Sequence, residues 1–344
     1  MAGRDNGVRP TVSRLRAMRA VTIDAEGGLA VRQVALPEPG CGQVRVRVVA
    51  CGICGSDLHM RASASLPAGT VMGHEFAGEV DAVGPDVTGF GGGERVCVFP
   101  APPVDRHDFR HYMTTGIGLG AAPGGFAEAV IVGADQLWRL PDSMAVEHGA
   151  LVEPLAVALH AINRGGVGPD RPAAVVGAGP IGVMTALALR ARGTERLVVL
   201  EPNELRRERM GALGIAAVGL DGARAAVRAE LGGDPAVVYE CAGHPSAPAL
   251  AIELVASTGC VVLLGALDEP VEISQITMIA KETDMRASFG YRPGDFTEAV
   301  ELIAAGRIPV DRVVTAVEPL ERAEEMFDAL TRPDSGQLKV LLRP

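Results

Sequence analysis

Three glycines in the spacing G-x-G-x-x-G constrain this chain more than any other feature of its sequence. Gly177, Gly179 and Gly182 follow the apolar run 173–176 and open the apolar run 181–191. A strand, a glycine turn and a helix in this order are typical of a parallel sheet that binds a dinucleotide. The first glycine permits a tight turn, the second lets the backbone approach a pyrophosphate, and the third allows close helix packing.

The residues around this turn indicate which dinucleotide is bound. Pro180 and Ile181 stand at the expected helix N-terminus, where backbone amides and the helix dipole favour a phosphate. The next strand ends on Glu201, whose carboxylate is expected to accept hydrogen bonds from the adenosine ribose. Because a carboxylate repels the 2′-phosphate of NADP, we expect NAD. Arg206 and Arg207 follow closely and either could reach a phosphate, so NADP is the less favoured alternative.

Two later runs, "AVVYECAG" (236–243) and "CVVLLGA" (260–266), continue the alternation of strands and helices. Ligands of an open parallel sheet bind outside the carboxyl ends of its strands. We therefore expect Cys241 and Gly265, which follow these two strands, to border the nicotinamide.

Before about residue 150 the sequence shows a different pattern of apolar and turn residues. Short β-branched runs separated by Gly and Pro, such as "QVRVRVVA" (43–50) and "FAGEVDAVG" (76–84), predict a small irregular β-barrel. A chain of 344 residues is long enough for this barrel and the dinucleotide domain together.

Charge and composition exclude several classes of protein. The net charge of −10, without a dominant basic cluster, argues against nucleic-acid binding. No apolar run reaches the roughly 18 residues of a membrane span, so we expect no membrane partner. The start of the chain lacks the apolar segment of a signal peptide, and six cysteines in this length do not form a dense disulfide framework. We expect a cytoplasmic protein.

The stretch "CGICGSDLH" (51–59) points to metal chemistry. A structural zinc site needs further cysteines nearby, and a redox pair usually stands at the start of a helix rather than among glycines. An open catalytic zinc site needs three protein ligands and one free position. Cys51 or Cys54 is able to supply a thiolate, His74 in "GHEFAGEV" an imidazole, and Glu75 or Glu153 a carboxylate.

Taken in this order, the motifs at 51–59, 73–80, 149–165 and 175–182 resemble the zinc-dependent medium-chain dehydrogenase/reductase family, most closely its sorbitol and threonine dehydrogenase branch. The resemblance implies an α/β fold, with a GroES-like β-barrel catalytic domain and a Rossmann doubly wound parallel-sheet domain. It implies four segments: a polar extension (1–17), the GroES-like domain (18–160), the Rossmann domain (161–297) and a C-terminal return to the catalytic domain (298–344).

The same resemblance assigns roles to individual residues. It makes Cys54 and His74 zinc ligands and leaves open whether Glu75 or Glu153 is the third. Ser56 and His59 match positions that touch the substrate oxygen or relay its proton to solvent. The implied activity is reversible, zinc- and NAD-dependent oxidation of a secondary alcohol to a ketone by hydride transfer. The implied partners are a small alcohol or ketone substrate and further copies of the chain, in a homodimer or homotetramer.

The chain departs from the family pattern in the stretch 97–125. Many members bind a structural zinc there through four cysteines, but this chain keeps only Cys97, so we expect one zinc per chain. The charged segment 105–112 within it is expected to be a solvated surface loop, with a role at the substrate entrance or a subunit contact as the alternative. Tyr291 matches a substrate-side tyrosine of the polyol branch, but Gly290 stands where an arginine is common.

Two other functions remain open at this stage. A zinc-free quinone or enoyl reductase of the same superfamily would keep the glycine motif without the Cys, His and Glu constellation. A non-catalytic nucleotide sensor on the same scaffold would bind NAD and show no turnover, and only the completeness of the metal set argues against it. Metal content separates these alternatives from the zinc-dependent dehydrogenase.

Overall fold

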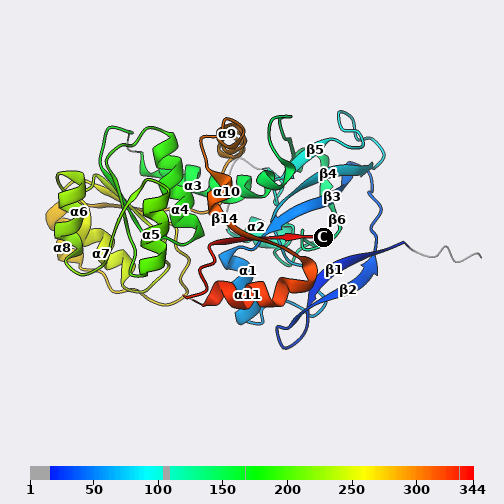
Figure 1. Ribbon diagram of the computed structural model, residues 1–344, viewed down its shortest axis with the longest axis horizontal. Helices are drawn as coiled ribbons and strands as arrows, with labels where there is room; N and C mark the ends of the chain where they lie inside the picture. Colours follow the sequence, from blue (N-terminus) through cyan, green and yellow to red (C-terminus); the bar gives the residue numbers. More distant parts are fainter. Residues whose placement is uncertain (1–15, 104–108, 167, 333) are drawn as a thin grey trace, which may run out of the picture.

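The computed structural model describes residues 16–103, 109–166, 168–332 and 334–344. It contains a six-stranded sheet and a seven-stranded sheet on opposite sides of the molecule, with a small two-stranded hairpin beside the second (Figure 1). Within these ranges no helix combines the length and the apolar character needed to cross a lipid bilayer.

The six-stranded sheet is parallel and has the strand order β10-β9-β8-β11-β12-β13. In chain order this is 3-2-1-4-5-6, the doubly wound order, whose switch point lies between β8 and β11. Short apolar runs that are buried on both faces form the central strands. The strands are β8 (Ala173–Val176), β9 (Leu197–Leu200), β10 (Ala216–Val218), β11 (Val237–Glu240), β12 (Cys260–Leu263) and β13 (Asp284–Ala287).

Helices cover both faces of this sheet. One core joins alternate strand residues to α3 (Val152–Gly165) and α4 (Pro180–Ala191), and another joins the intervening residues to α6 (Ala223–Leu231) and α7 (Ala247–Leu254). Two more helices complete this part: α5 (Glu204–Ala212) and α8 (Gln275–Lys281).

The seven-stranded sheet is mixed and has the order β14-β15-β3-β4-β5-β7, with β6 paired to β3. Its strands are β3 (Gln43–Gly52), β4 (Glu75–Val83), β5 (Arg95–Val98), β6 (Ala129–Gly133), β7 (Leu137–Arg139), β14 (Val314–Pro319) and β15 (Lys339–Arg343). The hairpin consists of β1 (Ala17–Ile23) and β2 (Leu29–Ala35), so β1 begins one residue inside the predicted polar extension.

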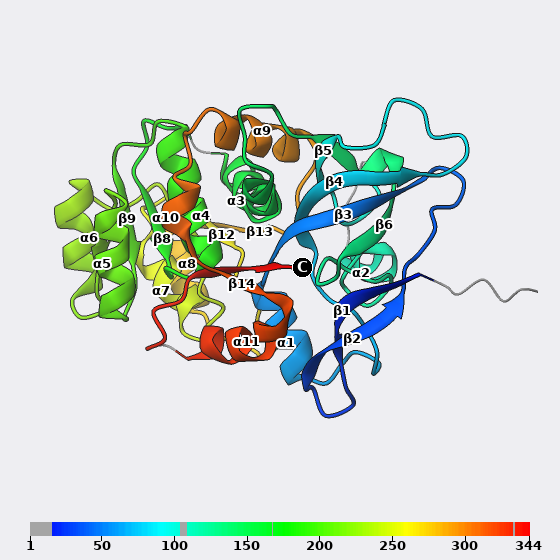
Figure 2. The same ribbon diagram turned by 45° about the vertical axis from the view of Figure 1, so that its right-hand side comes forward.

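The remaining helices connect these parts. Figure 2 shows α3 and α9 (Pro293–Ala304) lying between the two sheets. The others are α1 (Gly55–Ala62), α2 (Phe109–Thr115), α10 (Val310–Val313) and α11 (Ala323–Thr331), with short 3-10 helices at Ala134–Gln136, Val146–Leu151 and Leu320–Arg322.

The last strand of the chain lies beside the first long one. β15 pairs antiparallel with β3 at Leu341 opposite Gly52 and Leu342 opposite Cys51, and β14 continues the sheet beyond it. The C-terminal segment thereby reaches the end of β3 at which "CGICGSDLH" begins. This pairing crosses almost the whole sequence, so local sequence pattern carries no sign of it.

Candidate metal centre and dinucleotide site

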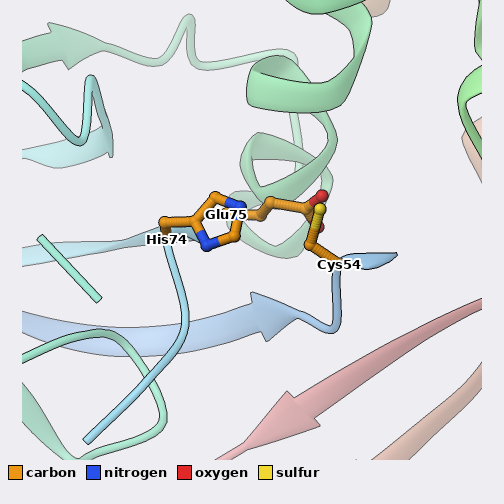
Figure 3. Close-up of side chains that lie close together, drawn as sticks. All are labelled: Cys54, His74 and Glu75. Carbon is orange, nitrogen blue, oxygen red and sulfur yellow. The ribbon is translucent and has the colours of Figure 1, made fainter. Parts of the chain in front are cut away.

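Cys54, His74 and Glu75 form a compact cluster of metal-ligating groups. The thiol sulfur, one imidazole nitrogen and one carboxylate oxygen all lie within 4.8 Å of one another. In Figure 3 the three side chains converge, with the Glu75 carboxylate next to the Cys54 sulfur. No other group of this kind is found among the described residues.

Strand register brings these residues together. Glu75 begins β4 and pairs across the ladder with Gly52 of β3, and Cys54 follows two residues later as the N-cap of α1. A Cβ added to Gly52 would lie 2.3 Å from the Glu75 Oε2 atom, so the close approach needs glycine. The "CGICG" run therefore ends a strand and starts a helix beside the carboxylate.

The Asp57 side chain contacts two members of the cluster, Cys54 and His74. Its side chain is fully buried, its Oδ2 atom accepts a hydrogen bond from the Cys54 backbone N–H at 2.9 Å, and its Oδ1 atom lies 3.6 Å from His74 Nδ1. The Nε2 atom of His74 is thereby turned to the other side, where Ser56 Oγ lies 3.4 Å away. An imidazole backed by a carboxylate in this way is the usual arrangement of a histidine metal ligand.

Lys339 supplies a positive charge to the same cluster. Its ammonium group donates to the Glu75 carboxylate and, at 3.0 Å, to the carbonyl oxygen of Ile53. Lys339 and Glu75 are each 1% exposed. Burial lowers the pKa of Lys339, but the charges of Glu75 and Cys54 outweigh it and leave the pKa raised. The ammonium group therefore stays charged and fixes the carboxylate.

The donor set fits a zinc ion. A thiolate, an imidazole and a carboxylate are the groups that zinc accepts in open catalytic sites. His74 Nδ1 and Asp57 Oδ1 are buried without a hydrogen-bond partner, as expected of a pair that tightens when the ring is held by a metal. Burial lowers the pKa of His74, but the Asp57 and Cys54 charges raise it well above its usual value. The cluster thus attracts a positive charge.

Glu153 lies beside this cluster, at the start of α3. Glu153 is 6% exposed and interacts electrostatically with His74, Glu75 and Lys339. Burial is the largest cause that raises the pKa of Glu153, to about 7. Within the 4.8 Å limit that joins the cluster, Glu75 is the carboxylate that is included and Glu153 is not.

Two tyrosines cover Glu153. Tyr112 Oη donates to Glu153 Oε1 at 3.4 Å and lies 2.8 Å from Tyr291 Oη. Tyr112 is 7% exposed and Tyr291 1% exposed. Burial and the Glu153 charge raise the pKa of both tyrosines well above the ordinary value, so both hydroxyls keep their protons.

Ser56 and His59 lie on the outer side of α1. Both are exposed and they are three residues apart, so they share one face of the helix. His59 Nε2 is 3.2 Å from Asp268 Oδ2, in the loop that follows β12. Ser56 therefore lies beside His74, and His59 is exposed to solvent three residues further along α1.

The glycine turn has the geometry that a dinucleotide needs. Gly177 has a φ of 98° and a Cβ at Gly182 would lie 1.9 Å from the Gly177 carbonyl oxygen, so both positions require glycine. A Cβ at Gly179 would meet nothing within 4 Å, which leaves the space in front of the α4 N-terminus open. Pro180 and Ile181 form the first turn of α4.

Glu201 follows β9, and its side chain contacts the glycine turn between β8 and α4. Its carboxylate is 4% exposed and accepts hydrogen bonds from Ala178 N at 2.7 Å and Asn203 N at 2.9 Å. Arg206 Nη1 lies 4.0 Å from this carboxylate. The Arg207 guanidinium instead donates to the backbone carbonyls of Glu201 and Pro202.

On the other side of the switch point, Glu240 accepts hydrogen bonds from the loops that follow β11 and β12. The Glu240 Oε1 atom accepts from Ala242 N at 2.8 Å and Gly243 N at 2.9 Å, and its backbone carbonyl accepts from Gly265 N at 3.0 Å. Cys241 lies between these groups, with its sulfur 3.7 Å from Thr185 Oγ1. Cys241 and Gly265 therefore lie near the carboxyl edge of the sheet.

Family models match both parts of the chain. The alcohol dehydrogenase GroES-like domain matches residues 40–142, and the zinc-binding dehydrogenase domain matches residues 180–305. The (R,R)-butanediol dehydrogenase of Bacillus subtilis is 32% identical, over 95% of this chain and all of that protein. This chain belongs to the zinc-binding alcohol dehydrogenase family. Human sorbitol dehydrogenase is 30% identical over 94% of this chain and 95% of its own length.

Solved structures agree with the fold of this dehydrogenase. The 2R,3R-butanediol dehydrogenase of Bacillus subtilis superposes with a TM-score of 0.87 at 31% identity, covering 95% of this chain and 99% of that one. A zinc-binding dehydrogenase from Sinorhizobium meliloti bound to NADP has a TM-score of 0.86 at 31% identity, with coverage of 96% and 100%. An alcohol dehydrogenase from E. coli CFT073 complexed with NADH has a TM-score of 0.86 at 27% identity, with coverage of 95% and 99%.

These comparisons confirm the predicted family, the GroES-like and Rossmann fold, and an oxidoreductase activity on alcohols for this dehydrogenase. One expectation from sequence is wrong in part. Residues 105–108 of the charged segment lie outside the described residues, and Arg110 is exposed, but Tyr112 is buried against Glu153 and is not part of a solvated loop.

Several residues of the dehydrogenase site were not predicted from the sequence. Asp57 and Glu240 are acidic residues at the ends of apolar or glycine-rich runs, and Lys339 is a lone cation inside the apolar run "LKVLL". For Glu240 and Lys339, an isolated charge in an apolar run is the signal that could have singled them out, since a charge is buried only with a partner. The sequence around Asp57 carries no such signal. The partner itself is set by the fold.

Proposed function

We propose that this protein oxidises a secondary alcohol to a ketone with NAD as hydride acceptor and one zinc ion per chain, bound by Cys54, His74 and Glu75. The convergence of a thiol, an imidazole and a carboxylate within 4.8 Å carries the proposal. We assign Glu75 rather than Glu153 as the third ligand because Glu75 belongs to the compact cluster. Cys97 is buried and belongs to no group of metal-ligating side chains found in the described part of the chain, which supports a single zinc.

Zinc bound at this cluster supplies Lewis acidity, which lowers the pKa of an alcohol substrate. The chain's own residues do the rest. Asp57 holds the His74 ring, and Lys339 holds the Glu75 carboxylate, so the ligands are oriented before a substrate arrives. Ser56 stands beside His74 Nε2 and is the group we assign to accept the substrate proton.

The proton then needs a route to water. His59 is exposed and lies on the same face of α1 as Ser56, so it is placed to pass the proton to solvent. Glu153 lies beside the cluster, and in the zinc-free protein burial raises the pKa of its carboxyl to about 7. We assign the Glu153 carboxyl group to hydrogen bonding with the bound substrate.

NAD is the proposed acceptor because of Glu201. Its buried carboxylate stands where the adenosine ribose is expected and repels a 2′-phosphate. Arg207 is engaged with backbone carbonyls, which leaves Arg206 as the nearby cation. The two similar structures with bound cofactor hold NADH in one case and NADP in the other, so the chain's own residues are the basis of the choice.

We further propose that residues 18–160 and 298–344 form the catalytic domain, around residues 161–297 as the cofactor domain. The pairing of β15 with β3 supports this division. We propose a homodimer formed through the edge strand β13 and helix α8, where Ile276 is 72% and Ile279 61% exposed. The six free cysteines fit a reducing compartment, and we propose the cytoplasm.

Metal analysis with paired activity measurements tests the proposal. Purified protein should contain about one zinc per chain, and Cys54→Ser and His74→Ala variants should lose it together with NAD-dependent oxidation of secondary alcohols. A folded protein with no zinc would point instead to a zinc-free reductase. A folded protein that binds zinc and NAD but oxidises no alcohol would point to a sensor. The exposed variant Asp221→Asn serves as a control that should keep both zinc and activity.

A further inference from the structure

A groove lies between helix α5 and two segments from near the end of the chain. It shares no lining residue with the metal cluster or with the glycine turn. One face of α5 contributes most of the lining, and α10 and the segment before β15 complete it. The lining includes Leu205, Glu208, Arg209, Leu213, Arg312 and Gly336. The volume of the groove is about 690 Å³, which is typical of sites for small molecules.

Part of the groove is apolar. Leu205 near the start of α5 is 51% exposed, and Leu213 at its C-terminal end is half-buried. The two leucines are eight positions apart, which is about 12 Å along a helix axis. The apolar surface between them therefore suits an alkyl chain rather than a single methyl group.

Two guanidinium groups line the groove from opposite segments. Arg209 of α5 donates a hydrogen bond to the carbonyl oxygen of Gly336, and Arg312 of α10 donates to the carbonyl oxygen of Ala212, the last residue of α5, at 3.1 Å. Each guanidinium has five N–H donors, so most of them remain available to a ligand. Among the residues that the structure describes, neither arginine forms an ion pair with a carboxylate.

The charge of the groove favours an anion with a single negative charge. Burial lowers the pKa of Arg209, and the nearby charge of Arg206 lowers it further, so a negative charge placed there would relieve both effects. Glu208 is the one carboxylate in the lining and is exposed. With Arg209 and Arg312 it leaves one net positive charge, which a monoanion balances and a dianion exceeds.

We propose that this groove is a second ligand site, separate from the metal cluster, which binds a monocarboxylic acid with a medium-length alkyl chain. The carboxylate lies between Arg209 and Arg312, because guanidinium groups bind planar carboxylates with paired hydrogen bonds. The alkyl chain covers the surface between Leu205 and Leu213. The inference does not depend on the reaction at the metal cluster. A bound acid would connect α5 to the C-terminal segment of the chain.

Calorimetric titration of the zinc-loaded protein without coenzyme tests the site. The probes are octanoate, hexanoate and octanamide, the last being an uncharged analogue of the same chain length. We expect octanamide to bind at least about tenfold more weakly than octanoate, because it lacks the charge that pairs with the guanidinium groups. Hexanoate should also bind about tenfold more weakly, because two methylene groups are lost. Equal affinity for octanoate and octanamide, or no binding of octanoate, would overturn the proposal.

Substitutions in the groove locate the bound acid. Arg209→Gln and Arg312→Gln each remove one positive charge and should each weaken octanoate binding by about tenfold. The affinity for octanamide should change little in both variants. Arg171→Gln, at an exposed position of the cofactor domain outside the groove, is the matched control and should bind octanoate as the parent does. Unchanged octanoate affinity in both groove variants would contradict the assignment.

The metal cluster is the competing site, since a carboxylate is itself a zinc ligand. The titration is therefore repeated with Cys54→Ser, which removes one of the groups assigned to the metal. Octanoate binding at the groove should persist in this variant and should still be weakened when Arg209→Gln is added. Binding that is lost in Cys54→Ser but kept in Arg209→Gln and Arg312→Gln would place the acid at the metal cluster and overturn the proposal.

Discussion

Lys339 and Glu75 form an ion pair in the interior of the protein, with each side chain 1% exposed. The lysine begins the last strand of the chain and the glutamate begins β4, so the pair fastens the C-terminal segment to the metal cluster. A buried pair of this kind contributes little net stability, but removal of one partner leaves the other charge without compensation.

Replacement of Lys339 should therefore destabilise the zinc-free protein strongly. We expect Lys339→Met to lower the free energy of unfolding by about 3–5 kcal/mol, measured by urea denaturation without metal. Zinc should recover part of this loss because the cation takes over the compensation of Glu75. The double variant with Glu75→Gln, which removes both charges, should be more stable than Lys339→Met alone. A zinc-free Lys339→Met protein as stable as the parent would contradict this account.

Asp57 should control zinc affinity rather than zinc stoichiometry. Asp57→Asn keeps the hydrogen bond to the Cys54 amide but removes the charge that faces His74 Nδ1. We expect zinc to bind about 10–100-fold more weakly, measured by competition with a chromophoric chelator. The exposed Asp221→Asn substitution is the matched control. Unchanged zinc affinity in Asp57→Asn would show that His74 needs no such support.

Glu153 should make the stability of the zinc-free protein depend on pH. Its folded-state pKa is about 7, above the ordinary value of 4.5, so the folded state binds the proton more tightly than the unfolded state. Ionisation of Glu153 thus costs stability as the pH rises between these two values. Relative to the parent, Glu153→Gln should become more stable at about pH 8 than at about pH 5.

Urea unfolding of the zinc-free parent and Glu153→Gln at both pH values measures this difference. The exposed Glu301→Gln variant controls for the loss of a carboxylate at the surface. A stability difference between parent and Glu153→Gln that stays constant with pH would show that Glu153 is not held in a raised-pKa environment.

Glu201 should set the choice of coenzyme. Glu201→Gln keeps an oxygen acceptor for the Ala178 amide but removes the negative charge. We expect the ratio of kcat/KM with NADP to that with NAD to rise by about tenfold, equivalent to about 1.4 kcal/mol. Adding Arg206→Ala to this variant should reverse much of the gain, since Arg206 is the nearby cation. A ratio that does not respond to Glu201→Gln would refute the charge argument.

Helix α8 should hold two copies of the chain together. The double variant Ile276→Glu and Ile279→Glu places charges on the exposed apolar face and should convert a dimer into a monomer, as measured by light scattering after size exclusion. Leu220→Glu, at a residue 45% exposed elsewhere on the cofactor domain, should leave the dimer intact. A parent protein that elutes as a monomer would contradict the assignment.

Local sequence pattern was sufficient to predict the first strand, turn and helix of the cofactor domain. The run 173–176, the glycine spacing and the following apolar run predicted β8, the turn and α4 because each depends on residues close in the chain. Cys54 and His74 were predicted as metal ligands from the resemblance to the dehydrogenase family, with the third ligand left open between Glu75 and Glu153. The fold brings Cys54, His74 and Glu75 within 4.8 Å of one another. That role stays a prediction until zinc is measured.

Residues close together in the chain fix the chemistry available at each position and the backbone that short-range pattern enforces: the glycine turn, the alternation of strands and helices, and the ligand types. Which of these groups meet depends on how distant segments pack. Lys339 reaches Glu75 because β15 pairs with β3, and Tyr112 reaches Tyr291 and Glu153 because three distant segments pack together. A buried charge or hydroxyl needs a partner, but no local pattern names that partner when the contact spans the length of the chain.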